Sequence, residues 1–180
     1  NFDGTINYKQ NNNQFNFSAG RNFFDGWDPN DPFLEFPESR LADTTRVKQW
    51  NPKEQWFSKL SHIYSNSNFS IRSYATIFDE QITNRGMPRA PYYQVAFDDY
   101  YNTLRSDVGF DVKKKFNEKS ELRIIAAYNY YGRIKNTFVK DLTNLEQQIT
   151  PSQDDQDTTK FDLLISRGTF SKVKGKLNYQ

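Results

Sequence analysis

The sequence contains no cysteine, one histidine and one methionine among its 180 residues. Without cysteine there is no disulfide framework, no thiolate metal site and no thiol nucleophile. Long hydrophobic runs are also missing. The longest lies around 124–128, far short of the roughly 20 residues of a membrane-spanning helix. The net charge of +2 does not indicate a nucleic-acid-binding surface.

Catalytic constellations are equally scarce. His62 has no serine and aspartate at a spacing that would indicate a triad. The acidic stretches 98–99 and 154–157 supply oxygen ligands, but neither has the position and glycine pattern of a calcium loop. The sequence therefore predicts a protein that is not an enzyme and holds no metal or cofactor.

Aromatic residues are abundant, with 16 Phe and 11 Tyr, and apolar residues recur at every second position. From 104 to 112, for example, an apolar set alternates with an almost wholly charged one. A period of two is the signature of strands with one apolar face. The alternation predicts about seven strands, at about 3–10, 14–23, 53–64, 68–79, 104–116, 121–135 and 158–170. In the last of these, Phe161, Leu163 and Ile165 are expected on the apolar face. The chain thus opens directly in a strand and not in a signal peptide, so it is expected to start in mid-structure.

Short and long connections between these strands alternate. Polar turns at 11–13, 65–68 and 117–120 separate paired strands, whereas long irregular segments are expected at 25–52, 82–101 and 141–157. The strands exceed the usual 5–6 residues of globular proteins and suit tilted membrane strands. Short turns on one side, long loops on the other and rings near strand ends are typical of outer-membrane barrels. A secreted β-sandwich also alternates and is the competing interpretation.

The barrel interpretation assigns the clearest apolar positions to lipid. These lipid-facing candidates are Phe69, Ile71, Val108, Phe110, Val112, Leu122, Ile124 and Tyr128.

Rings and arginines gather in the first two long segments. Aromatic side chains give large contact areas at low entropic cost, as recognition surfaces require. The ligand-binding candidates are Trp27, Phe33, Phe36, Arg85, Arg89, Tyr92, Tyr93, Tyr100 and Tyr101. For any single residue, packing of loops over a barrel mouth is the better explanation, but it does not account better for the whole set.

Several segments carry a family resemblance. They are 18–27, 84–88, 97–103, 127–137 and 140–143. Through them the chain resembles the barrel of Bacteroidetes-type TonB-dependent outer-membrane receptors. The similarity is diffuse, extends over nearly the whole chain and involves no catalytic centre.

The resemblance implies a 22-stranded barrel closed by an N-terminal plug, in the outer membrane of a Gram-negative bacterium, importing a large or scarce solute. It implies as partners outer-membrane lipid, the rest of the barrel with its plug, the inner-membrane energy-coupling complex and a surface lipoprotein. About seven strands cannot close so large a barrel. Residues 1–180 are therefore expected to be a partial barrel without plug or remaining strands. The alternatives are a secreted all-β adhesion module and a barrel subunit with a structural role.

Overall fold

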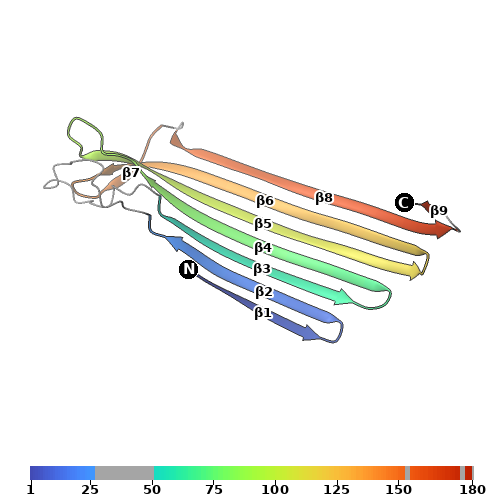
Figure 1. Ribbon diagram of the computed structural model, residues 1–180. Helices are drawn as coiled ribbons and strands as arrows, with labels where there is room; N and C mark the ends of the chain where they lie inside the picture. The colour runs from blue at the N-terminus through green and yellow to red at the C-terminus, as the bar shows by residue number, and fades with distance from the viewer. Residues whose placement is uncertain (27–50, 153–154, 175–176, 180) are drawn as a thin grey trace.

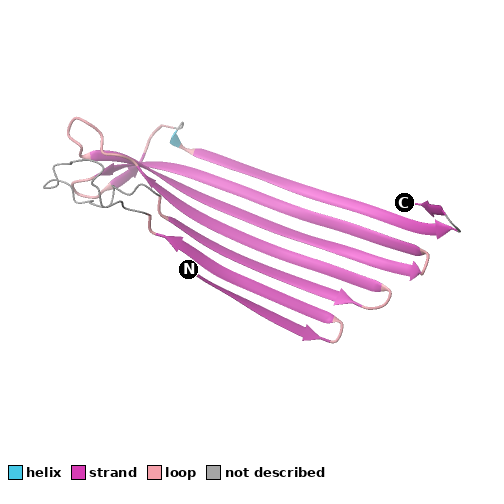
Figure 2. Cartoon of the chain, viewed as in Figure 1, coloured by secondary structure: helices cyan, strands magenta, loops and turns pink. Residues whose placement is uncertain are grey.

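The computed structural model describes residues 1–26, 51–152, 155–174 and 177–179. Within them nine strands form one antiparallel sheet in the order β1-β2-β3-β4-β5-β6-β8-β9, with β7 paired to β6 (Figure 1). The long strands are β1 (Phe2–Gln10), β2 (Asn13–Phe24), β3 (Lys53–Ser65), β4 (Phe69–Arg85), β5 (Val95–Asn117), β6 (Ser120–Asp141) and β8 (Asp157–Lys174). Two short strands, β7 (Gln147–Ile149) and β9 (Leu177–Tyr179), complete the sheet. Figure 2 shows that strands make up nearly all of the described chain.

Asparagine side chains build the short turns at one end of the sheet. Asn11 adopts a positive φ of 51° between β1 and β2, a conformation that asparagine tolerates well. Asn66 Oδ1 accepts the backbone N–H groups of Asn68 and Phe69. Asn117 Oδ1 accepts the Lys119 N–H in the same way. These local hydrogen bonds reverse the chain within a few residues and fix the register of the flanking strands.

The opposite end carries the long connections, and there the strands extend further than the sequence predicts. Residues 82–101 were expected to be irregular, but β4 continues to Arg85 and β5 begins at Val95. This prediction was wrong outside 86–94. The ladder explains the difference, because Arg85 pairs with Asp98 and Val95 pairs with Asp141. Backbone pairing continues there although the apolar alternation has stopped.

The sheet is a single layer and has almost no interior. The accessible surface of the whole chain is 13096 Å², against about 9,100 Å² expected for a compact monomer of its mass. Among the described residues the buried hydrophobic side chains are Ala96 and Leu142, both at the long-connection end. The sheet is also open, since β1 and β9 lie at opposite ends of the strand order. The prediction of an all-β antiparallel fold is confirmed, whereas a closed barrel is not formed by the described strands.

The register of β8 reverses the expected orientation of that strand. Leu164 pairs with Tyr128, and Leu163 pairs with Asn129. The second pair places Phe161, Leu163 and Ile165 with the polar set of β6, so their assignment to the apolar face was wrong. The strand has apolar residues on both faces, and its own pattern does not decide between the two registers.

Candidate functional site

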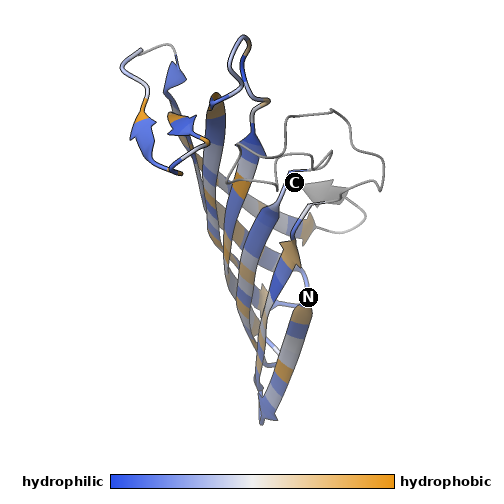
Figure 3. Ribbon diagram, turned by 90° about the vertical axis from the view of Figure 1, so that its left-hand side faces the viewer, coloured by the Kyte–Doolittle hydropathy of each residue, from blue (hydrophilic) through white to orange (hydrophobic). Residues whose placement is uncertain are grey.

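One face of the sheet is apolar from edge to edge. Residues paired across neighbouring strands point to the same side, so the register defines each face. One such row crosses all seven long strands and consists of Ile6, Phe17, Leu60, Ala75, Val108, Tyr128 and Leu164. We call this side the apolar face. Hydrophobic and hydrophilic positions alternate as coloured bands along the strands in Figure 3.

All eight residues predicted to face lipid lie on the apolar face. They fall in four successive rows of β4, β5 and β6, and the pairs Ile71–Val112 and Val112–Ile124 connect them across strands. Many of these side chains are exposed, Val108 by 47% and Phe110 by 42%. Soluble monomers rarely expose so many neighbouring apolar side chains, and such a surface marks a site of contact with a protein, a ligand or a membrane.

Charges bound the apolar band on both sides. Along β4 the apolar face stays uncharged from Phe69 to Ile77 and then reaches Asp79. At the short-turn end, Lys114 pairs with Phe69 and Lys172 pairs with Ser120. From Phe69 to Asp79 the strand rises about 33 Å. For strands tilted by about 40° this is a height of about 25 Å, the height of the apolar band of outer-membrane barrels.

Aromatic rings cluster at both borders of the band. Near the short turns the rings of Phe116 and Phe170 lie 6.4 Å apart. Towards the long connections Phe2 packs edge-on against Trp56 at 6.1 Å, and the Arg21 guanidinium lies 5.3 Å from the Trp56 ring centre. Rings beside charged groups at two levels match the aromatic girdles of membrane barrels.

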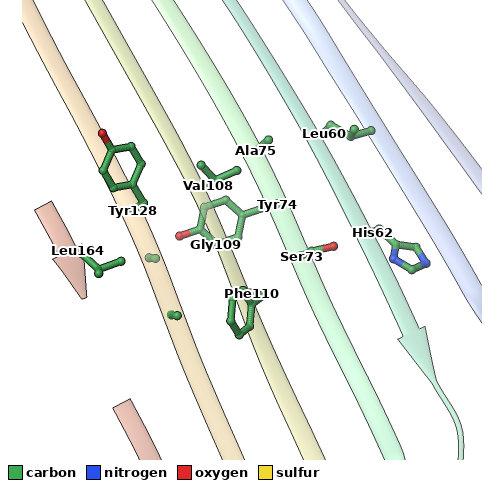
Figure 4. A pocket seen from close by; sticks show the side chains of 12 residues that line it. Leu60, His62, Ser73, Tyr74, Ala75, Val108, Gly109, Phe110, Tyr128 and Leu164 are labelled. Atoms are coloured by element: carbon green, nitrogen blue, oxygen red, sulfur yellow. The ribbon is translucent and has the colours of Figure 1, made fainter. Parts of the chain in front are cut away.

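A shallow hollow of about 470 Å³ lies in the middle of the apolar face (Figure 4). Its floor includes the small residues Ser73, Ala75 and Ala126, and larger side chains such as Phe110 and Leu164 frame it. His62 lies at its rim, stacked on Phe15 at 4.5 Å, with Nε2 2.9 Å from Asn13 Oδ1. The one histidine of the chain is thus held by a ring and an amide, and the hollow is lined mainly by apolar side chains.

The opposite side, which we call the charged face, carries paired ions and amides. Arg123 binds Asp111 through two hydrogen bonds of 2.9 and 2.6 Å, which hold both side chains in a fixed plane. Lys113 Nζ lies 2.8 Å from Glu121. Asp107 accepts a hydrogen bond of 2.9 Å from the Thr76 hydroxyl. On this face, oppositely charged and polar side chains of neighbouring strands thus pair with each other.

Arginines and rings alternate on the charged face towards the long connections. The Arg105 guanidinium lies between two rings, 5.6 Å from the centre of Phe78 and 5.3 Å from that of Tyr131. Arg133 lies 4.7 Å from the centre of Tyr101. This set presents cations and rings to one side, as binding surfaces for polar ligands do. Sequence reasoning missed Arg105 and Arg133 as site residues, although their alternation with apolar neighbours identified the face.

Glycine lets a ring lie flat on the charged face. Tyr74 covers Gly109, its cross-strand partner, as Figure 4 shows. A Cβ at Gly109 would lie 2.7 Å from three atoms of the Tyr74 ring and hydroxyl. The missing side chain of Gly109 is therefore a packing requirement.

The structure disperses the predicted ligand-binding residues. Arg89, Tyr92 and Tyr93 lie in the connection 86–94, where the Arg89 guanidinium sits 3.7 Å from the Phe97 ring centre. The sequence predicted a loop for Arg85, Tyr100 and Tyr101, but all three belong to strands. Tyr100 and Tyr101 are consecutive in β5 and therefore face opposite sides. Trp27, Phe33 and Phe36 lie outside the described residues.

No protein-family model matches the chain, and no curated protein is detectably similar to it. Among the described residues, no helix is long and apolar enough to cross a membrane. Within the same part of the chain, no three His, Asp or Glu side chains group as a metal site would require.

Proposed function

We propose that this sheet is part of the wall of an outer-membrane β-barrel, in a TonB-dependent receptor that imports a large or scarce solute. The observation that carries the proposal is the apolar band: an exposed face continuous over seven strands, about 25 Å high on tilted strands, with charges and rings at both borders. Among its described residues the band holds one charge, Asp162 of β8, whose carboxylate accepts a hydrogen bond of 2.6 Å from the Tyr128 hydroxyl. Lipid acyl chains are the occupant that suits this face, and the hollow at Ala126 accepts one.

The charged face is assigned to the barrel interior. There Arg105 and Arg133, stacked on rings, supply cationic contacts for a solute or for the plug. The connection 86–94 lies at the end of the sheet that would face outside the cell, where it would meet the solute or a surface lipoprotein. Import then requires no catalyst: the solute is captured, the plug rearranges under force from the inner-membrane complex, and the solute passes.

The open edges of the sheet require partners in this environment. An unpaired strand edge in hydrocarbon costs several kcal/mol for each unsatisfied backbone group. We therefore infer that β1 and β8 pair with further strands of the same barrel. The pairing would use the outer edge of β1 and the part of the outer edge of β8 that β9 does not cover. Mass spectrometry of the intact polypeptide in a detergent-solubilised membrane fraction tests this inference. A product several-fold heavier than these 180 residues is expected, whereas a 21.3 kDa species in the aqueous fraction would contradict the inference.

Two adjacent alanines give a matched test of the lipid assignment. Ala126 lies on the apolar face and pairs with Phe110, whereas Ala127 lies on the charged face and pairs with Gly109. An arginine near the midplane of a lipid-facing surface costs about 2–4 kcal/mol. Ala126→Arg is therefore expected to weaken assembly into phospholipid vesicles, measured by protection from added protease, while Ala127→Arg leaves assembly largely intact.

Equal assembly of the two variants would contradict the lipid-facing assignment. If the unmodified chain stays monomeric in buffer without detergent and does not enter vesicles, the secreted all-β binding module takes the place of the receptor.

A further inference from the structure

A second hollow lies on the same side of the sheet as the apolar band, nearer the long connections. This outer groove has a volume of about 260 Å³ and is formed by β4, β5, β6 and β7. It is lined by four amides and two rings, contributed by Gln81, Asn102, Asn136, Gln147, Tyr100 and Phe138. Among the described residues that line it, none carries a charge.

The two rings of the groove are fixed against each other. Tyr100 and Phe138 meet edge to face, with ring centres 5.4 Å apart and an interplanar angle of 90°. The Tyr100 hydroxyl lies 3.5 Å from Gln147 Oε1, so the rings and the amide of β7 border one space. Residues two apart in a strand share a face, so Thr83 lies on the side of Gln81 and its partner Tyr100 on the side of Asn102. Asp98, two residues before Tyr100, pairs with Phe138, and both rings therefore lie on the same side of the sheet as the amides.

This combination of groups selects a class of ligand. Primary amides offer both donors and acceptors, which matches neighbouring hydroxyl groups, and ring faces pack against the C–H surface of a pyranose. A phosphate or carboxylate would instead require a cation or a set of backbone N–H groups. An acyl chain would offer none of the four amides a hydrogen-bond partner, and burying an amide without a new partner costs free energy. A neutral saccharide therefore fits the groove best.

The level of the groove indicates where such a saccharide comes from. Gln81 is the next residue on this side of β4 after Asp79, where the apolar band ends. Its distance from Ala75, in the middle row of the band, is about 20 Å along the strand. Tilted by about 40°, this is about 15 Å above the midplane, half the thickness of a hydrocarbon core. The groove thus opens at the height of lipid headgroups.

We propose that the outer groove binds the neutral saccharide headgroup of a glycolipid in the surrounding outer leaflet. The assignment of the level rests on the proposed membrane function, whereas the saccharide chemistry rests on the lining residues alone. The apolar hollow at Ala126 lies below the groove on the same face, so hydrocarbon and sugar would be bound along one line of the wall.

The probe is dodecyl maltoside, a lipid-anchored neutral disaccharide, titrated into the full chain in dodecylphosphocholine micelles. The methyl resonance of Thr83, which lines the groove, is expected to shift and saturate. The methyl of Thr5, on the charged face of β1, is the internal control and is expected to stay in place. Because each buried hydrogen bond contributes modestly, the double variant Asn102→Ala/Asn136→Ala should weaken binding about tenfold. Asn22→Ala, at an exposed position on the charged face, should not.

Three results would overturn the inference. Thr83 and Thr5 shifting alike would show a general detergent effect, and unchanged binding by the double variant would remove the groove as the site. Free maltose binding as tightly as the anchored disaccharide would assign the groove to soluble sugars. Contacts between the Val108 methyls and detergent chains report separately on the membrane function: if these are present without a Thr83 response, only the saccharide inference fails; if they are absent, the membrane function itself fails.

Discussion

The apolar band and the long-connection end of the sheet are stabilised in different ways. The band is one layer thick and holds no buried hydrophobic side chain among its described residues, so its order comes from backbone ladders and from whatever covers its two faces. At the long-connection end, by contrast, Ala96, Leu142, Asp98, Thr137 and Thr150 are all buried. The stability of the band should therefore depend on the medium that covers it, whereas the stability of the long-connection end should depend on its internal hydrogen bonds.

The largest expected effect tests the dependence of the band on its surroundings. On the proposed lipid-facing assignment, Phe110→Arg in the middle of the apolar face should lower the stability of the vesicle-assembled protein by about 2–4 kcal/mol, because the guanidinium would be buried in hydrocarbon. Urea unfolding followed by tryptophan fluorescence measures the change. Ile149→Arg is the matched control, since Ile149 is equally apolar and 56% exposed but belongs to β7, beyond the band. An effect of similar size at both positions would remove the distinction between the two regions.

The second prediction concerns the polar core at the other end. The buried Thr137 hydroxyl lies 2.6 Å from Asp99 Oδ1 and 2.7 Å from the Asp155 carbonyl oxygen. Thr137→Val leaves these acceptors without that donor, which should cost about 1–2 kcal/mol. This loss of stability should be measurable as faster hydrogen exchange at the Thr150 amide, which donates a hydrogen bond of 3.0 Å to the Thr137 carbonyl oxygen.

The exchange pattern also shows whether the two regions unfold together. Thr5→Val, at an exposed position of β1, serves as the control and should change nothing. Exchange at Val108, within the band, is expected to stay unchanged in Thr137→Val. Equal acceleration at Val108 and Thr150 would mean that the band and the polar core form one cooperative unit.

The third prediction compares two glycines at the level of the band, Gly109 on the charged face and Gly168 on the apolar face. Gly109→Ala should destabilise by about 1 kcal/mol, because the clash with the Tyr74 ring outweighs the entropic benefit of alanine. Gly168→Ala should stabilise by about 0.5 kcal/mol, since nothing lies within 4 Å of its Cβ position. Opposite signs in urea unfolding are the expected result. In a Tyr74→Ala background the cost at Gly109 should disappear, and persistence of that cost would rule out the ring as its cause.

The sequence predicted the strands of the band well, because period-two alternation is explicit there. The alternation did not predict the strand ends at 82–85 and 95–101, because it stops before them. Backbone pairing holds these ends, and it leaves no pattern in the side chains. The alternation also failed in β8, whose two faces are both apolar, so that only pairing with β6 decides the register. The outer groove was not foreseen, since it joins residues of four strands that no local spacing connects.

The smallest expected effect is the pH response of one turn at the long-connection end. Asp141 Oδ1 accepts hydrogen bonds from the Thr143 hydroxyl at 2.6 Å and from the Thr143 N–H at 2.8 Å. Both hydrogen bonds lower the pKa of Asp141 below its ordinary value of 3.8, and the bond from the Thr143 hydroxyl has the larger effect. A lowered pKa means that the turn is stabilised above pH 3.8 and that this contribution is lost as the pH falls through the lower, folded value. The Thr143 amide resonance is therefore expected to move only below pH 3.8. In Asp141→Asn this titration should be absent, and its persistence would assign the transition to another carboxyl group.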